Sequence, residues 1–195
     1  MNNLFQNTIT KEEIEKLPLA GFTGAIHMVD NESQVVKAIE HLSQYPFIGF
    51  DTETKPSFKK GKSNKVSLVQ LSTSTDAYLF RLNKIGLPLE LCNLLGDERI
   101  SKVGLAVRDD LNAMKKIRLF EPKNVIDLQT LVKEYGIEDM SLKKIAAIVM
   151  NIRITKSQQT SNWEIEELTE AQLAYAATDA WACFEIYAKI KSMTP

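Results

Sequence analysis

The sequence predicts an α/β domain in which helices cover both faces of a mixed central β-sheet. Three runs rich in β-branched and aromatic residues follow one another, separated by polar loops, and favour a meander of antiparallel hairpins: Phe47–Thr54, Val66–Thr73 and Ala77–Leu82. Alternating strand and helix patterns come next, and such units add parallel strands to a sheet. The last helical pattern, Glu170–Ser192, contains neither Gly nor Pro.

The other elements follow from the same patterns in chain order. Residues 1–23 are largely polar, and we expect a short helical or irregular lead-in there. Before the meander, the patterns predict a strand over Ala25–Val29 and a helix over Glu32–Gln44. After it, they predict two strands, each followed by a helix: Lys102–Val107 and Asn124–Ile126. We therefore assign a single domain to residues 24–193.

The composition is that of an ordinary globular domain. The 195 residues include 44% hydrophobic residues, and 24 Lys plus Arg against 25 Asp plus Glu give a net charge of -1. A chain of this length can bury a full core without disulfides. The balance excludes a disordered acidic tail and a generally basic polyanion binder, so any affinity for nucleic acid has to come from a local patch.

Cysteine and histidine are too few and too scattered for a zinc site or a disulfide framework. Cys92 and Cys183 lack CxxC spacing, and only His27 and His41 accompany them. No run approaches the roughly 18 apolar residues that span a bilayer, and the first residues lack the features of a signal peptide. We expect a cytoplasmic protein that does not contact membranes.

A pair of acids ends the first run of the meander. Asp51 and Glu53 are two residues apart on a strand, so both carboxylates point to the same face of the sheet. Adjacent like charges raise each other's pKa unless a cation neutralises them, and Mg²⁺ or Mn²⁺ prefers carboxylate oxygen. The alternative is a strand end with two exposed acids.

A tyrosine and an acid share one stripe of the last helix. Tyr175 and Asp179 are four residues apart, which places them one turn from each other. The stripe continues through Ala182 and Ile186, so the carboxylate of Asp179 needs a partner. That partner is either a neighbouring Lys or backbone group, or the ligand of a functional site.

A second acidic pair follows the strand predicted over Lys102–Val107. Asp109 and Asp110 open a helix, where the helix dipole and capping favour acids without any functional role. Only one of the two needs to be functional, and the other is expected to cap the helix. Asp127 also stands at a strand-to-helix junction and is predicted to be a cap rather than a ligand.

The loop after Glu53 is basic. Residues 55–65 contain five lysines and no acid. Such a run is ordinarily a solvated hairpin loop, but here it emerges beside the acids. Phosphate contacts are therefore a hypothesis for three of its lysines, Lys59, Lys60 and Lys62.

Taken together, the acids and the tyrosine resemble the signature of the DEDD exonuclease superfamily, with its three motifs in the same order. The five matching positions are Asp51, Glu53, Asp110, Tyr175 and Asp179. The frame Asp110-Leu111 fits the second motif, so Asp110 is preferred over Asp109. Flanking residues such as Ser161-Asn162-Trp163 are similar to the tyrosine subgroup, which includes ribonuclease D and the exonuclease domain of the Werner syndrome helicase.

The resemblance implies a ribonuclease H-like fold and hydrolysis of nucleic acid from a free 3′ end, releasing nucleoside 5′-monophosphates. It implies two divalent ions, Mg²⁺ or Mn²⁺, with Asp51 bridging both. Glu53 and Asp179 would help to hold one ion and Asp110 the other, while Tyr175 would orient the attacking water. Two other readings stay open: a catalytically silent nucleic-acid-binding module, and an RNA-trimming enzyme like ribonuclease D.

Overall fold

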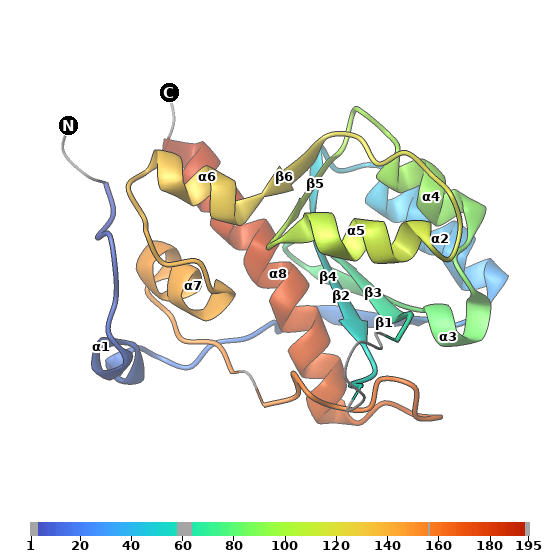
Figure 1. The fold of residues 1–195 in the computed structure, drawn as a ribbon, viewed down its shortest axis with the longest axis horizontal. Coiled ribbons are helices and arrows are strands. Elements are labelled where there is room, and N and C mark those ends of the chain that lie inside the picture. The colour runs from blue at the N-terminus through green and yellow to red at the C-terminus, as the bar shows by residue number, and fades with distance from the viewer. Residues whose placement is uncertain (1–3, 58–63, 156, 194–195) are drawn as a thin grey trace.

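In the computed structural model, which describes residues 4–57, 64–155 and 157–193, one six-stranded sheet forms the centre of the protein. The strand order is β1-β4-β3-β2-β5-β6 (Figure 1). The strands have these bounds: β1 (Ala25–Val29), β2 (Phe47–Thr54), β3 (Val66–Ser72), β4 (Asp76–Arg81), β5 (Ser101–Gly104) and β6 (Val125–Asp127). The long strand β2 therefore lies inside the sheet.

The pairing of the strands confirms the predicted mixed sheet. β2 and β3 are antiparallel, as are β3 and β4, and these three strands form the expected meander. β1 joins β4 in parallel, while β5 and β6 extend the sheet from β2 in parallel. The parallel strands come from chain segments that pass through helices, because a parallel connection needs a crossover.

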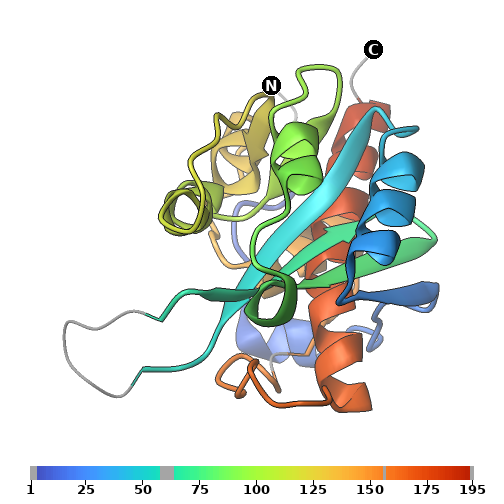
Figure 2. The same cartoon turned by 90° about the vertical axis from the view of Figure 1, so that its right-hand side faces the viewer.

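Helices cover both faces of the sheet (Figures 1 and 2). Their bounds are α1 (Lys11–Lys16), α2 (Glu32–Leu42), α3 (Leu82–Ile85), α4 (Leu89–Leu95), α5 (Val107–Lys115), α6 (Leu128–Glu134), α7 (Leu142–Met150) and α8 (Glu170–Met193). Apolar residues of α2, α4 and α5 pack against one face, and those of α6, α7 and α8 pack on the other side.

The alternation of side chains along β2 assigns its residues to these two faces. Ile48 and Phe50 are buried in the core formed with α2, α4 and α5. Gly49 and Asp51 therefore face α8, since neighbouring strand residues point to opposite sides. The sequence of β2 thus places its two acids on the face that α8 covers.

The backbone of α8 approaches β2 at a glycine. A Cβ atom built on Gly49 would lie 2.0 Å from the carbonyl oxygen of Ala180, a distance that no packed structure accommodates without movement. Gly49 is therefore required for the close contact between strand and helix. This contact lies two residues before Asp51 and one residue after Asp179.

The start of α8 is fixed by a capping box. The backbone N–H of Gln172 donates to Thr169 Oγ1, and the backbone N–H of Thr169 donates to Gln172 Oε1. The buried amide of Gln172 also donates to the carbonyl oxygen of Asn162, in the segment that precedes the helix. These bonds fix the rotation of α8 about its own axis, and thereby which of its side chains face the sheet.

The strand predicted over Lys102–Val107 is shorter in the structure. β5 ends at Gly104, and Ala106 adopts the left-handed region with a φ of 52°. Val107 then begins α5 and is buried in the core. A short apolar run does not reveal whether its last residues continue a strand or open a helix, so the prediction was wrong at this end.

The lead-in packs onto the rest of the protein. α1 begins with a capping box between Thr10 and Glu13, and Ile9 and Ile14 are buried against Ala147 of α7. No helix in the described part of the chain is long and apolar enough to cross a membrane.

Replacing Gly49 with Ala is expected to destabilise the protein by about 3 kcal/mol, because the added methyl group meets backbone rather than a flexible side chain. Urea unfolding would measure the change in free energy. Gly96→Ala is the matched control, since its added carbon lies 3.1 Å from the nearest atom and its φ is -85°. Equal stability losses in the two variants would contradict the proposed contact.

Candidate active site

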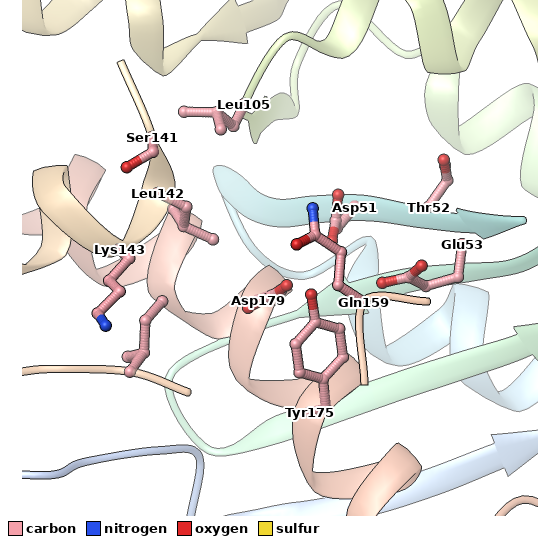
Figure 3. A pocket seen from close by; sticks show the side chains of 11 residues that line it. Asp51, Thr52, Glu53, Leu105, Ser141, Leu142, Lys143, Gln159, Tyr175 and Asp179 are labelled. Carbon is pink, nitrogen blue, oxygen red and sulfur yellow. The ribbon is translucent and has the colours of Figure 1, made fainter. Parts of the chain in front are cut away.

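Strand β2 and helix α8 bring three carboxylates together. Oxygen atoms of Asp51, Glu53 and Asp179 all lie within 4.8 Å of one another. Two of these acids come from the end of β2, and the third comes from the middle of α8 (Figure 3). Asp179 directly precedes Ala180, whose carbonyl lies against Gly49. The structure thus brings together three acids that stand in two separate motifs of the sequence.

A cavity of about 230 Å³ opens over these acids. Tyr175 borders it one helical turn before Asp179, and its hydroxyl group points toward the carboxylates (Figure 3). The other lining residues come from β2, from the loop after β5, from the start of α7 and from the segment between α7 and α8: Thr52, Leu105, Ser141, Leu142, Lys143, Ile154 and Gln159. The cavity is therefore acidic at its base and mixed at its walls.

Burial and mutual repulsion raise the pKa values of the clustered acids. The pKa of Asp51 lies well above its usual value because the carboxyl is removed from water and faces the charges of Asp179, Glu53 and Asp110. The same causes, again with burial first, raise the pKa of Glu53 to about 8. Without a cation, the cluster therefore retains protons at neutral pH.

Tyr175 is held in its protonated form. Burial is the largest cause that raises the pKa of its phenol, and the charges of Asp179 and Glu53 raise it further. A hydrogen bond with Asp179 has the same effect, since the phenol donates to the carboxylate. The ring is buried and lies 6.1 Å from that of Trp163, centroid to centroid. In the metal-free protein Tyr175 therefore keeps its proton and donates it to Asp179 in a hydrogen bond.

Asp110 lies beside this cluster without joining it. Its carboxylate accepts a hydrogen bond of 2.6 Å from Thr52 Oγ1, and its oxygens are outside the group of three. Burial raises the pKa of Asp110 to about 6, against the opposing effect of the Thr52 hydrogen bond. Its charge still raises the pKa values of Asp51 and Glu53, so it acts on the same site.

Asp109 does not cap α5, contrary to the expectation from the sequence. The N-cap is Ala106, which offers no side-chain hydrogen bond, and Asp109 is exposed. Asp127 does cap α6, as predicted, because its carboxylate accepts from the backbone N–H of Gln129. The same oxygen also accepts from the N–H of Ala106 and thereby supports the turn before α5.

The three lysines predicted to contact phosphate, Lys59, Lys60 and Lys62, lie outside the described residues. At the base of that loop, Lys55 Nζ lies 3.3 Å from a carboxylate oxygen of Glu164. Glu164 also accepts a hydrogen bond from Ser67 on β3. The basic loop thus begins from a position that is tied to the segment before α8.

Some residues that support or line the site could have been recognised from local sequence patterns. Thr169 and Gln172 show the Thr-x-x-Gln pattern of a capping box, which was visible before a long apolar helix. Gln70 is a single amide inside a strand that is buried along its whole length. Gln159 has no such signal, because its place in the cavity depends on the path of a loop.

The donor set fits divalent cations. Three carboxylates with oxygens this close repel one another, and cations of high charge density relieve that repulsion while binding oxygen ligands. Neither sulfur nor imidazole contributes to the cluster of three. Residues Asp51, Glu53 and Asp179 are therefore suited to hold a divalent cation that prefers oxygen ligands, with Asp110 close by.

Without metal, the protein is expected to lose stability as the pH rises from about 5 to about 8. Glu53 has an ordinary pKa of 4.5 and a folded pKa of about 8, so the folded state holds a proton that the unfolded state releases in this range. Each such carboxyl lowers the free energy of unfolding by about 1.4 kcal/mol per pH unit at most. Urea titrations in EDTA would measure the slope.

Glu53→Gln should flatten this slope, whereas Asp109→Asn should not, since Asp109 is exposed. An unchanged slope in Glu53→Gln would show that Glu53 ionises normally in the folded state.

Comparison with known proteins assigns most of the chain to a family of nucleases. A sequence family described as 3′–5′ exonuclease matches residues 26–195. A protein of Acanthamoeba polyphaga mimivirus is 34% identical over 190 residues, which cover 88% of this chain and 46% of that protein. The bifunctional 3′–5′ exonuclease/ATP-dependent helicase WRN of Mus musculus is 31% identical over 191 residues, or 92% of this chain and 14% of that protein.

Solved structures share the fold. The Nibbler EXO domain of Aedes aegypti superposes with a TM-score of 0.77 at 26% identity, covering 86% of this chain and 87% of that one. The sheet and its flanking helices thus form the ribonuclease H-like fold expected from the resemblance. The chain spans only 14–46% of the lengths of four curated relatives. It belongs to the 3′–5′ exonuclease family of the DEDD superfamily.

Proposed function

We propose that this protein is a divalent-metal-dependent 3′–5′ exonuclease of the tyrosine subgroup. It removes nucleoside 5′-monophosphates from the 3′ end of a nucleic acid by hydrolysis of phosphodiester bonds. The observation that carries the proposal is the cluster of Asp51, Glu53 and Asp179 with Tyr175 at the base of one cavity. Family membership supports the same activity, and residues 24–193 are proposed as the unit that performs it.

The chemistry requires a nucleophile to attack a phosphate that is already negative. Two bound Mg²⁺ or Mn²⁺ ions would supply a water of lowered pKa and would stabilise the charge on the leaving 3′ oxygen. The protein contributes carboxylates that are held in place before any ligand arrives. Asp51, Glu53 and Asp179 are proposed to hold one ion, with Asp51 shared with a second ion that Asp110 helps to hold.

Tyr175 is proposed to orient the attacking water. A phenol that keeps its proton at neutral pH is a poor base, so orientation of the water is the role proposed for this residue. Its hydroxyl lies at the cavity wall and is aligned by its bond with Asp179. Because its one proton goes to Asp179, the phenol oxygen would restrain the water molecule by accepting a hydrogen bond from it.

The substrate is proposed to be DNA or RNA with a free 3′ end. Discrimination depends on how the cavity treats a 2′-hydroxyl group, and the polar side chains of its wall include Ser141 and Gln159. Trimming of RNA in the manner of ribonuclease D is the second candidate. Lys59, Lys60 and Lys62 remain proposed phosphate contacts, because their loop starts directly after β2. We also propose a cytoplasmic location, supported by two buried free thiols, Cys92 and Cys183.

A 5′-labelled DNA or RNA oligonucleotide incubated with the protein should give a ladder of products shortened from the 3′ end. The ladder should require Mg²⁺ or Mn²⁺ and should disappear in EDTA. Asp51→Asn should lower the rate by at least about 100-fold, since it removes a central ligand charge. Asp109→Asn is the matched control and should cleave at the wild-type rate. Binding without any ladder under both metals would favour the silent binding module.

Tyr175→Phe should lower kcat roughly 10- to 100-fold, because the attacking water loses its restraint. Binding of Mn²⁺, measured by titration calorimetry, should weaken by less than kcat falls, since every carboxylate is retained and only the phenol bond to Asp179 is lost. Tyr187→Phe makes the same change three turns farther along α8 and should have no effect. An unchanged rate in Tyr175→Phe would refute the proposed role.

A further inference from the structure

Gln70 is a buried amide without a partner. Its side chain is fully buried, and neither Oε1 nor Nε2 has a hydrogen bond to any residue that the structure describes. Buried polar groups are ordinarily satisfied, and leaving an amide unpaired in an apolar environment costs free energy. An exception in the middle of a central strand therefore needs an explanation.

The pairing of the strands places Gln70 beside the acidic cluster. Gln70 on β3 is directly opposite Asp51 on β2 in their antiparallel ladder. Residues that face each other in this way have side chains on the same side, with Cβ atoms about 4.5–5.5 Å apart. The amide of Gln70 therefore shares the face of the sheet that carries Asp51 and is covered by α8.

Two other described neighbours of Gln70 within the sheet are apolar. On its second side, Gln70 faces Leu79 of β4, which is fully buried. Leu68, two residues away on the same face, belongs to an apolar cluster with Leu79 and Trp163. Asp51 is thus the polar side chain that the sheet places next to Gln70.

A metal ligand beside the amide would give it a partner. Carboxylates that hold a divalent cation are themselves hydrogen-bonded by neighbouring groups, and those bonds set the direction of the ligand. Gln70 is placed to donate such a bond to Asp51, because it lies opposite this residue in the ladder and its own amide is unpaired. Tyr175 is already bonded to Asp179.

We propose that Gln70 is a positioning residue that donates an amide N–H to the carboxylate of Asp51 when divalent metal is bound. The bond fixes the direction of a carboxylate that would otherwise turn freely beneath the ions. It acts through Asp51 and does not touch the substrate. This inference rests on the proposed function, because it needs Asp51 to be a metal ligand.

The test is a Mn²⁺ titration of Gln70→Met, Gln70→Leu and the wild type without substrate. Electron paramagnetic resonance measures the free Mn²⁺ at each point. Both changes keep the volume and remove the amide, so either one suffices if the other fails to fold. The dissociation constant for Mn²⁺ should rise about 10- to 100-fold. In EDTA, thermal unfolding of the variants should occur at or above the wild-type temperature, because an unpaired amide has been removed.

Leu79→Met provides the matched control, since Leu79 is buried directly across from Gln70 and has no polar group. It should bind Mn²⁺ as the wild type does. With an oligonucleotide substrate, the Gln70 variants should lose kcat while KM stays within about twofold, as a defect in metal positioning requires. In the wild type, the side-chain ¹⁵N–H signals of Gln70 should shift when Mg²⁺ is added.

Each outcome has a separate meaning. Wild-type affinity for Mn²⁺ in the Gln70 variants, or a Gln70 signal that ignores Mg²⁺, would overturn the role of Gln70 and leave the proposed function intact. Failure of the wild type to bind Mn²⁺ would overturn both proposals. Binding of Mn²⁺ by the wild type without cleavage of any oligonucleotide would refute the exonuclease alone, and the titrations would still decide the role of Gln70.

Discussion

The approach of α8 to β2 at Gly49 and Ala180 determines the geometry on which the site depends. A contact between backbone atoms allows little adjustment, because no side chain can turn to absorb a displacement. Asp51 and Asp179 lie within two residues of this contact, so their separation is fixed by the fold rather than by their own bonds. The capping box of Thr169 and Gln172 then fixes the rotation of the helix.

This rigidity is needed because bringing the acids together in a buried place lowers the stability of the fold. Acids whose pKa values are raised by burial and mutual repulsion are groups that the unfolded chain would solvate better. The apolar clusters on both faces of the sheet provide the stabilisation that holds them together. Functional sites commonly combine unfavourable local electrostatics with stabilising packing elsewhere in the fold.

The sequence was sufficient for most of the architecture. The meander, the parallel additions and the long last helix follow from periodic patterns, and both acids of β2 follow from a spacing of two. The end of β5 could not be predicted, because the left-handed turn at Ala106 has no Gly or Asn to mark it. The relation of Asp110 to Thr52 and that of Gln159 to the cavity depend on packing between distant segments, which local patterns do not encode.

The assembly of the cluster from β2 and α8 also has a consequence for biosynthesis. A growing polypeptide exposes Asp51 and Glu53 early, whereas Tyr175 and Asp179 emerge only after all six strands of the sheet have been translated. Until α8 packs against β2, a nascent chain carries two of the three clustered carboxylates, and its cavity lacks Tyr175. The complete cluster therefore forms only in molecules whose last helix has been synthesised and has docked on the sheet.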